Sequence, residues 1–386
     1  MSHSEPLRAG RKHVHKNLEA TPSIPFSPSE LGSLGVEMEW FTVSNDSGMQ
    51  TPAAETYLSE IPQSPRIKQE LFTSILEINT GIHHDSRACV GELQALYQQA
   101  SAGIAMHDAS LLSAGTHPFS AWHEQIVSQD ERYNHLIDRL QWVARRFNIC
   151  GIHVHIGMPN GDACIHSMNA LMPVLPVFLA ISANSPFWRG KDTGLHACRI
   201  KIFEGLSQGG MPFYFESWKD FEHCAGRLIA TGSIDSIRDI WWEMRPHPDF
   251  GTLEIRIGDM PAIKEDALAY IAYVRAEVMA AAHKPQPKRV HPSLIRENRW
   301  RACRYGMQAE MIDPHNEELV PVLDWIATRL DKLEGANQKD LSLVADRLEH
   351  WRTHGDGAER QRRIRARHAG PLAMVKSMQE DGWHGG

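Results

Sequence analysis

The sequence predicts an α+β fold in which a mixed or antiparallel sheet is combined with helices. Three observations lead to this prediction. The strand-like segments all fall before about residue 260. They alternate apolar and polar residues, which is typical of a sheet with one buried and one wet face rather than of a fully buried parallel sheet. Helical patterns, with apolar residues three and four positions apart, interleave with these segments and dominate from about residue 262 onward.

Four segments have strand character. The first is 34–43 (LGVEMEWFTV), and a polar loop rich in Ser, Pro and Gln follows it. The segment 70–80 (ELFTSILEINT) begins with helix-like composition and ends with strand alternation. A short alternating strand is predicted at 150–157 (CGIHVHIG). The run 239–259 predicts two strands joined by a loop that carries Pro and Gly.

Helices are predicted where the apolar spacing is three or four residues. Residues 163–183 are expected to form a buried helix, and 130–147 begins with two acidic residues, which the helix dipole favours at a helix N-terminus. The other predicted helices are 88–112, 217–230, 264–282, 294–304, 317–333, 338–353 and 357–368. We expect a single domain over 31–370, with flexible tails at 1–30 and 371–386.

Composition excludes several classes of protein. With 386 residues, of which 42% are hydrophobic and 23% charged, the chain has enough apolar residues for a large core. Forty basic and 47 acidic residues give a net charge of −7, which argues against a general nucleic-acid binder. The longest apolar stretch, 170–183, is about half to two-thirds of a membrane span and contains two prolines, so no membrane is expected.

The N-terminus and the cysteines indicate a cytoplasmic protein. Residues 1–30 are polar and turn-rich, and no apolar segment typical of a secretory signal follows the basic residues. The six cysteines are scattered without CxxC spacing, which favours reduced thiols over a disulfide framework or a zinc ribbon.

Each predicted strand carries a strongly polar front and an apolar back. Residues two apart in a strand share a face. The pairs that share a face are Glu37 and Glu39, Glu77 and Asn79, His153 and His155, and Glu254 and Arg256. Taken alone, each pair is more often part of a solvated sheet face, a histidine pair whose hydrogen bonds are satisfied, or a surface charge pair than part of a functional site. Their joint occurrence on Gly-flanked strands with apolar backs favours a site.

The residue types of this polar face indicate phosphoryl transfer. Four glutamates on one face would repel one another unless cations lay among them. Carboxylates with one or two imidazoles suit Mg²⁺ or Mn²⁺ better than zinc. Arg256 beside such ions is suited to hold phosphate, while the ions bridge phosphate oxygens. No GxxxxGK[ST] loop is present, so a nucleotide would not be held in a Walker A cradle.

The motifs resemble those of a known family. The sequence resembles the carboxylate–amine ligases related to type 2 glutamate–cysteine ligase, which have a glutamine-synthetase-like fold. The resemblance runs from about residue 31 to 306, and more loosely to about 365. The motifs are LGVEMEWF (34–41), ELFTSILEINTG (70–81), AGTHPF (114–119), ERY (131–133), GIHVHIGM (151–158), ISANSPFWRGKDTGLHACR (181–199), SQGGMPFYF (207–215), DIWWEMRPHPDFGTLEIRIGD (239–259) and ENRWRACRYG (297–306).

This resemblance implies a fold and a set of ligands. It implies a curved, mainly antiparallel sheet whose concave face is the active site, with helices packed outside, so that 31–370 would be one catalytic domain. It implies ATP as co-substrate and Mg²⁺ or Mn²⁺ as cofactor. The implied metal ligands are Glu37, Glu39, Glu77, His153 and Glu254. Family relatives read GVEEE where this chain has Met38, but alternation puts Met38 on the apolar back, so no ligand is lost.

Further roles follow from the resemblance. Arg256 would hold the transferred phosphoryl group, and Arg256 and Glu77 are expected to act in catalysis. The resemblance favours His153 as the metal ligand and His155 as the phosphate or nucleotide contact, although the spacing alone leaves the two open.

Other candidates are less specific. Arg199 and Arg245 are candidates for holding a substrate carboxylate, and Thr116 and His117 for lining the substrate pocket. Arg301 is a candidate nucleotide contact, with a solvated arginine-rich helix as the alternative. The segment ERQRRIRAR (359–367), with a charge of +4, is either an exposed helix end or a phosphate-facing or subunit contact.

The expected function is therefore an ATP-dependent ligase that joins a carboxylate to an amine. The γ-carboxylate of glutamate would attack ATP, and an amine such as cysteine would displace phosphate from the acyl phosphate, which would place the enzyme in glutathione biosynthesis. A metal-dependent hydrolase and a non-catalytic nucleotide or amino-acid sensor are the alternatives. The expected partners are small molecules, and the size of the apolar helices suggests a homodimer.

Overall fold

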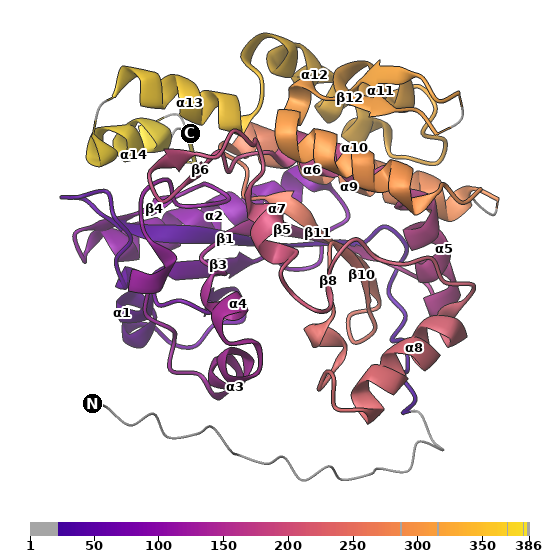
Figure 1. Ribbon diagram of the computed structural model, residues 1–386, viewed down its shortest axis with the longest axis horizontal. Coiled ribbons are helices and arrows are strands. Elements are labelled where there is room, and N and C mark those ends of the chain that lie inside the picture. The colour runs from indigo at the N-terminus through magenta and orange to yellow at the C-terminus, as the bar shows by residue number, and fades with distance from the viewer. Residues whose placement is uncertain (1–21, 286–287, 315, 369, 381, 384–386) are drawn as a thin grey trace, which may run out of the picture.

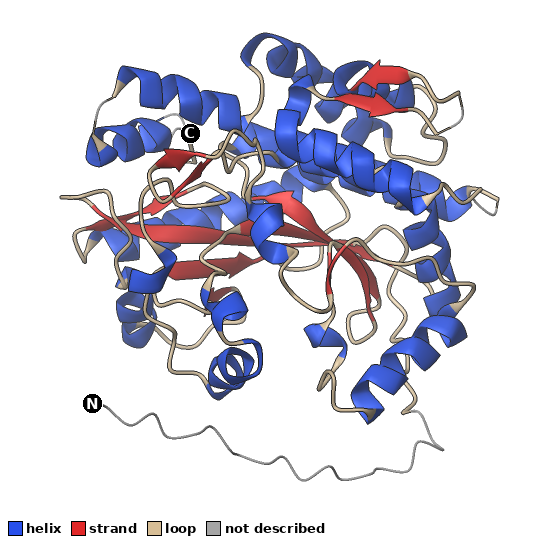
Figure 2. Ribbon diagram, in the orientation of Figure 1, coloured by secondary structure: helices blue, strands red, loops and turns tan. Residues whose placement is uncertain are grey.

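A seven-stranded sheet forms the centre of the protein in the computed structural model, which describes residues 22–285, 288–314, 316–368, 370–380 and 382–383 (Figures 1 and 2). The strand order is β10-β11-β5-β1-β3-β2, and β4 pairs with the second half of β1. Every pairing in this sheet is antiparallel. The predicted α+β class with a mainly antiparallel sheet is confirmed.

The strands of this sheet lie close to the predicted segments. They are β1 (Leu34–Ser44), β2 (Ile67–Gln69), β3 (Ile75–Asn79), β4 (Ala109–Leu112), β5 (Gly151–Gly157), β10 (Met244–His247) and β11 (Thr252–Asp259). Three small two-stranded pairs lie outside it: β6 (Phe187–Trp188) with β7 (Lys191–Asp192), β8 (Gly209–Gly210) with β9 (Trp241–Trp242), and β12 (Glu310–Ile312) with β13 (Leu319–Pro321).

Helices cover one face of the sheet in two layers, seen above it in Figure 2. The α-helices of the whole described structure, of which α1, α3, α4 and α8 lie below the sheet in Figure 1, are α1 (Ala53–Glu60), α2 (Ser86–Ala105), α3 (Glu131–Leu140), α4 (Trp142–Arg145), α5 (Gly161–Leu171), α6 (Leu175–Ser182), α7 (Arg199–Phe203), α8 (Trp218–Ala230), α9 (Lys264–His283), α10 (Pro292–Tyr305), α11 (Val322–Leu330), α12 (Gln338–His354), α13 (Gly357–Arg367) and α14 (Pro371–Glu380). Helices α2, α5, α6 and α9 contact the strands or one another directly, and α10 and α12 pack on α6 and α9.

The apolar backs of the strands form the core beneath these helices. Met38 and Trp40 of β1 are fully buried, as are Val154 of β5 and Ile255 of β11. The prediction that Met38 belongs to the apolar back is thus confirmed. Burial of these side chains contributes roughly 1.5–3 kcal/mol each, which holds the opposite, polar face in a defined orientation.

Two predicted helices are shorter than expected because turns interrupt them. The segment 88–112 is not one helix: α2 ends at Ala105, Asp108 adopts a left-handed conformation (φ 52°), and β4 follows. The apolar residues of β4 match the three- and four-residue spacing of a helix, but they form a strand that pairs with β1. The segment 130–147 likewise breaks at Gln141 (φ 51°) into α3 and α4.

Other segments gain breaks or elements that the sequence pattern did not show. The predicted helix 163–183 is a pair, α5 and α6, bent by 70°. Pro176 lies in the first turn of α6, where its missing N–H costs no helical hydrogen bond. Helix α11 begins only at Val322, after β13, and the polar loop after β1 contains α1 and β2.

The chain ends differ from the expected tails. Residues 1–21 lie outside the described residues, but residues 22–30 run along the domain: Ile24 is buried, and its N–H donates to the Glu222 carboxylate at 2.6 Å. The segment from 371 onward is not a tail, because α14 buries Met374 and Met378. Trp383 is also buried and lies against Trp40 at a centroid distance of 5.5 Å. The apolar spacing of 371–378 could have indicated this helix.

Among the described residues, no single helix is long and apolar enough to cross a membrane; the bent pair of α5 and α6 meets that length and composition only when the two are joined.

Candidate active site

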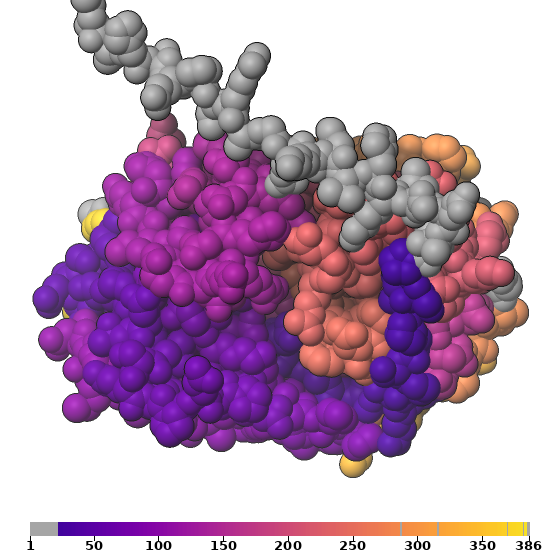
Figure 3. Space-filling view, turned by 90° about the horizontal axis from the view of Figure 1, so that it is seen from below, coloured from indigo at the N-terminus to yellow at the C-terminus, as the bar shows by residue number. Residues whose placement is uncertain are grey.

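A pocket of about 420 Å³ opens on the polar face of the sheet. Its walls come from the sheet, from α3, and from the region around β9 and β10. Figure 3 shows the surface hollowed between the magenta segment that includes α3 and the salmon-coloured segment that includes β10. The predicted residues that line the pocket are Glu37, Glu39, Glu77, His153, His155, Arg199, Arg245, Glu254 and Arg256. The volume lies in the range of about 300–1,000 Å³ that is typical of small-molecule sites.

Strand register brings the polar pairs together. Glu37 of β1 lies opposite His153 of β5, and Glu39 lies opposite Glu77 of β3. Glu254 of β11 lies opposite His155 of β5. Because β5 and β3 flank β1 on its two sides, the site extends across four neighbouring strands.

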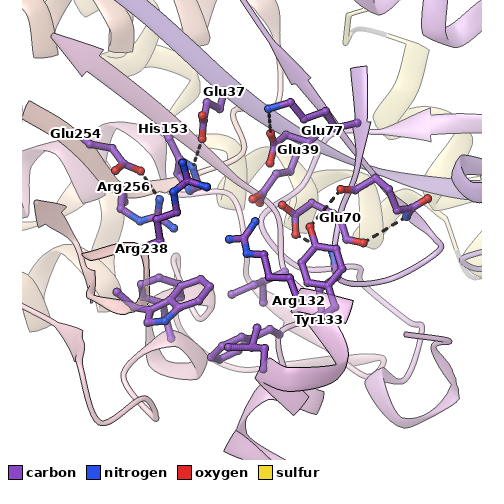
Figure 4. A pocket seen from close by; sticks show the side chains of 18 of the residues that line it. Glu37, Glu39, Glu70, Glu77, Arg132, Tyr133, His153, Arg238, Glu254 and Arg256 are labelled. Carbon is purple, nitrogen blue, oxygen red and sulfur yellow. Dashed lines mark hydrogen bonds and ion pairs between the residues drawn. The ribbon is translucent and has the colours of Figure 1, made fainter. Parts of the chain in front are cut away.

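Glu37, His153 and Glu254 form the first of two groups that could hold a metal ion. Ligand atoms of the three lie within 4.8 Å of one another. His153 Nδ1 is 3.2 Å from the Glu37 carboxylate, and Figure 4 shows both beside Glu254. Burial raises the pKa of Glu37, but hydrogen bonds and charges from the two histidines outweigh it and hold the pKa well below its usual range. Burial, together with the charge of Arg256, lowers the pKa of His153 to about 4. The group is thus two ionised carboxylates and a neutral imidazole, a donor set that fits a divalent cation.

Glu39, Glu70 and Glu77 form the second group, again within 4.8 Å of one another. Burial raises the pKa of Glu39 to about 7, and the charge of Glu77 adds to the rise. Burial and the neighbouring glutamates also raise the pKa of Glu70 well above its usual range. Lys68 is the cation nearest to Glu77, at 3.8 Å. The charge of Arg199 partly compensates Glu39, but burial and crowding of the three half-buried carboxylates still raise the pKa of Glu39 and of Glu70, and a divalent cation bound among them would relieve their repulsion.

Two arginines hold Glu254 from opposite sides. Arg256 Nη1 donates to one carboxylate oxygen, and Arg245 Nε donates to the other at 2.7 Å. Burial raises the pKa of Glu254, but the two guanidinium charges outweigh it and keep the pKa well below its usual range. Arg245 Nη1 also donates to three backbone carbonyls, those of Ile237, Arg238 and Ile240. By contrast, Arg256 Nε is buried and has no hydrogen-bond partner among the described residues. Arg245 is thus tied to the protein, whereas, in the part of the chain that the structure describes, the guanidinium of Arg256 is hydrogen-bonded only to Glu254 and its buried Nε–H is unpaired.

His155 lies at the β10–β11 end of the pocket. Its Nδ1 is 3.0 Å from the Thr252 hydroxyl, while its Nε2 is 3.7 Å from Glu37 and has no hydrogen-bond partner among the described residues. His247 and Phe250 stack face to face at 4.1 Å beside it. Phe250 is 52% exposed, so this stack forms an aromatic rim at the pocket mouth.

Arg199 lies beneath Glu39 and is 2% exposed. Its guanidinium lies so close to Gly151 that a Cβ there would come within 2.2 Å of Nη2, which explains why glycine stands at this position. The N–H of Gly151 in turn donates to the Glu39 carboxylate at 2.7 Å. Arg199 Nε has no hydrogen-bond partner among the described residues. A substrate carboxylate that reached it would gain a buried, charge-assisted hydrogen bond.

Three predicted site residues lie away from the pocket. Thr116 is fully buried, and its hydroxyl donates to the Phe187 carbonyl at 2.7 Å. Arg301 lies on α10, where it pairs with Glu297 at 3.1 Å. This contact agrees with the alternative interpretation, a solvated arginine-rich helix. His117 is buried beneath β1. None of the three lines the pocket. In the AGTHPF motif, the side chains of Thr116 and His117 therefore make structural contacts beside the sheet and do not enter the pocket.

His117 is a neutral structural histidine with a defined tautomer. Its Nε2–H donates to the Gly48 carbonyl at 3.1 Å, while Nδ1 accepts from the backbone N–H groups of Phe119 and Ser120. Burial lowers the pKa of His117 to about 3. Protonation would place a second N–H against two backbone donors.

This geometry predicts a pH dependence of stability. The unfolded chain takes up a proton at His117 below about pH 6.5, whereas the folded protein does not until about pH 3. The contribution of neutral His117 to the free energy of unfolding is therefore complete above pH 6.5. It is lost as the pH falls below that value, by about 1.4 kcal/mol per pH unit. Buried carboxyls such as Glu39 and Asp259 titrate in the same range with the opposite sign, so the contribution of His117 is the difference between two proteins. Urea unfolding at pH 7.5 and 5.0 should show that the unaltered protein loses more stability than His117→Gln by about this slope. Equal slopes in the two proteins would contradict the assignment.

The arginine-rich helix α13 makes contacts within the protein. Arg362 forms a bidentate pair with Asp192 at 2.9 Å, and Arg363 donates to the His354 carbonyl. Arg360 donates to the carbonyls of Ser377 and Met378 in α14. These contacts join α13 to α12, α14 and the β6–β7 hairpin, so the basic segment is neither a free helix end nor part of the pocket wall.

Glu70, Arg132 and Tyr133 line the pocket, but the sequence patterns assigned them no role. Glu70 lies in the loop before β3, where no alternation shows which way a side chain points. Arg132 and Tyr133 lie on α3, which faces the sheet across the pocket, and Figure 4 shows Arg132 pointing toward the carboxylates. Glu70 and the ERY segment do belong to motifs of the family resemblance, which was the signal available for finding them.

Comparisons with known proteins show the family of the chain. The family model for glutamate–cysteine ligase family 2 matches residues 33–383. Two relatives bear the name "Putative glutamate–cysteine ligase 2". One, from Gloeobacter violaceus, is 39% identical over 92% of this chain and 98% of its own length. The other, from Bdellovibrio bacteriovorus, is 41% identical over 75% of this chain and 78% of its own length.

Two solved structures share the fold. A glutamate–cysteine ligase from Francisella tularensis in complex with AMP has a TM-score of 0.68 and 14% identity, over 92% of this chain and 89% of that one. A bifunctional glutathione synthetase from Pasteurella multocida has the same TM-score and 13% identity, over 91% of this chain and 52% of that one. At these identities the likeness shows the fold alone.

Proposed function

Because the chain belongs to glutamate–cysteine ligase family 2, we propose that it is an ATP-dependent ligase that joins a glutamate-like carboxylate to an amine. The reaction would pass through an acyl phosphate and release ADP and phosphate. One observation carries the proposal: two groups of metal-ligand side chains lie on one sheet face, and Arg256 is close enough to both to interact electrostatically with Glu37, Glu254 and Glu39.

The residues fit Mg²⁺ or Mn²⁺. Glu37, His153 and Glu254 would hold one ion, and Glu39, Glu70 and Glu77 another. The donor set is five carboxylates and one imidazole, and a cation bound to the second group would relieve the repulsion between its carboxylates. When bound, such ions would neutralise phosphate charge and orient the γ-phosphoryl group.

The protein side chains would position the reactants and stabilise the charge that develops. The guanidinium of Arg256 would interact with the phosphoryl oxygens, while Glu254 holds it in place through Nη1. Because Glu254 already fixes the orientation of the Arg256 guanidinium, this interaction needs little reorganisation during reaction. The substrate carboxylate oxygen attacks the γ-phosphorus and ADP leaves. The neutral amine then attacks the acyl carbon, phosphate leaves, and the amine proton passes to solvent.

Charge distribution favours one orientation of the two substrates. At the β10–β11 end, the imidazoles of His155 and His247 and the ring of Phe250 suit the nucleotide, with Phe250 as a platform for the base. The carboxylate substrate would lie toward α3 and Arg199. Arg132 projects into that end and forms no ion pair among the described residues, which makes it the stronger candidate for a second substrate carboxylate. Arg245, predicted from the sequence for this role, is instead proposed to be structural, because Glu254 and three carbonyls occupy its guanidinium.

The test is the activation step, which needs no knowledge of the natural amine. Protein incubated with Mg²⁺, ATP, glutamate and hydroxylamine should form γ-glutamyl hydroxamate and an equal amount of ADP, because hydroxylamine traps acyl phosphates. Glu70→Gln should lower the rate by at least about 100-fold, since one ligand of the second group loses its charge.

Two results would contradict the proposal. One is the absence of hydroxamate with glutamate and with a panel of other carboxylates. The other is hydrolysis of an amide substrate without ATP and with a metal other than Mg²⁺. That result would favour a metal-dependent hydrolase.

A further inference from the structure

Three aromatic side chains form one continuous wall of the pocket. The ring centroids of Phe147 and Phe203 are 6.0 Å apart, and Trp241 lies 6.2 Å from the first and 6.1 Å from the second. All three line the pocket, and Leu136 and Ile149 extend the same apolar lining. They come from α3, the loop before β5, α7 and β9, so the folded chain assembles this wall from distant segments.

The wall adjoins the groups that would carry the reaction. Arg256 Cζ lies 5.7 Å from the centre of the Trp241 ring, and Arg199 Cζ lies 5.6 Å from that of Phe203. A molecule placed against the wall would therefore lie beside both the phosphoryl-binding arginine and the arginine beneath Glu39. If the acyl phosphate forms beside these two arginines, as the proposed function requires, an amine at the wall would lie next to its acyl carbon.

The chemistry of the wall suits neither the triphosphate of the nucleotide nor the carboxylates of the glutamate-like substrate. Triphosphate and dicarboxylate groups need cations or hydrogen-bond donors, and these lie on the sheet face and on α3. Within the wall, the only polar side-chain atom is Trp241 Nε1, which is buried and has no hydrogen-bond partner among the described residues. Apolar surface gains free energy when it covers such a wall, whereas an uncompensated polar group would lose it.

A second cavity of about 150 Å³ lies behind Trp241. Trp241 lines both this cavity and the main pocket. The other residues that line the cavity are the apolar Leu140, Leu206 and Ile234 and the polar Arg139, Ser207, Gln208, Ser233 and Asp239. The indole therefore separates the two spaces.

Building on the proposed ligase function, we propose that the acceptor is a primary amine with an apolar side chain that packs on Phe147, Phe203 and Trp241, and that Trp241 limits the size of this side chain. In the reaction, the amine nitrogen forms a bond to the acyl carbon as the carbon–oxygen bond to phosphate breaks. The side chain does not react; it supplies the binding energy that orients the nitrogen.

The test compares acceptors of equal shape and different polarity. With Mg²⁺, ATP and glutamate, kcat/KM for leucine should exceed that for its near-isostere asparagine by about tenfold or more. In Trp241→Ala, which would join the two cavities, the ratio of kcat/KM for phenylalanine to that for leucine should rise at least tenfold over the ratio in the unaltered protein. Trp241→Phe should shift the ratio in the same direction by less, and it serves as the variant if Trp241→Ala does not fold. The products are identified by mass spectrometry.

Phe250→Ala is the matched control. Phe250 is also aromatic and lines the pocket, but at the opposite end, so its loss should leave both acceptor ratios unchanged. Hydroxylamine has no side chain, so hydroxamate formation reports activation independently of the wall. If hydroxamate forms but leucine is not preferred over asparagine, or if neither Trp241 variant changes the ratio, the inference is overturned while the ligase function stands. If no hydroxamate forms, it is the proposed function that fails.

Discussion

Arg256→Lys should lower the rate of hydroxamate formation by about 10³-fold or more, with a much smaller effect on nucleotide affinity. Arginines that stabilise a transferring phosphoryl group contribute about 10³–10⁵-fold to the rate. Lysine keeps the charge but cannot donate to Glu254 and to phosphate in the fixed geometry of a guanidinium. Single-turnover ADP formation and equilibrium nucleotide binding separate the two effects.

Arg245→Lys is the matched control for this prediction. Arg245 has the same Glu254 partner and similar burial, but its Nη1 is occupied by backbone carbonyls. Its substitution should therefore lower stability more than it lowers the rate. Equal rate losses in the two variants, measured on folded protein, would show that Arg256 has no special part in phosphoryl transfer.

Glu254→Gln should abolish activity and also weaken the fold. Glu254 is 1% exposed and compensates two buried arginines, so its neutralisation leaves two positive charges facing each other in the pocket wall. Breaking a buried ion pair by removing one partner costs about 3–5 kcal/mol. The first ligand group also loses one of its two carboxylates. Urea unfolding should show the loss of stability, and Mg²⁺-dependent ADP release should fall at least about 100-fold.

Glu277→Gln separates the two consequences. Glu277 of α9 has a side chain that is also 1% exposed, and it pairs with Arg329 of α11 and accepts from the Tyr273 hydroxyl at 2.8 Å. It does not line the pocket. This variant should lose stability and keep its rate per folded molecule. If Glu254→Gln kept its rate as well, the first ligand group would have no role in the reaction.

Glu70 shows why part of the site could not be assigned from sequence alone. It lies seven residues before Glu77, in a loop whose residues have no period of two, so no pattern showed its direction. The backbone N–H of Leu71 donates to the Glu70 carboxylate at 2.9 Å, and the chain path before β3 turns the carboxylate toward Glu39 and Glu77. Only long-range pairing of β3 with β1 makes these three glutamates one group.

His117 shows the opposite failure, and we propose that Arg245 does so as well. Both are polar residues in motifs of the resemblance, and their types suited a substrate pocket. Their actual partners, the Gly48 carbonyl for His117 and Glu254 with three carbonyls for Arg245, depend on where distant backbone segments pass. A buried polar group takes the hydrogen bonds that surround it, and residue type does not specify them.

Strand alternation determined, from the sequence by itself, which side chains share a face. Glu37 with Glu39, His153 with His155, and Glu254 with Arg256 all point into one pocket, because apolar neighbours on the other side must be buried. Only the tertiary structure decided which strand lies beside which, and in what register. That order placed Glu37 opposite His153 and Glu39 opposite Glu77, and it brought α3 and the aromatic wall across from them. The physical reason is that a side chain's direction along a strand is a local property, whereas pairing and packing depend on contacts between segments far apart in the chain.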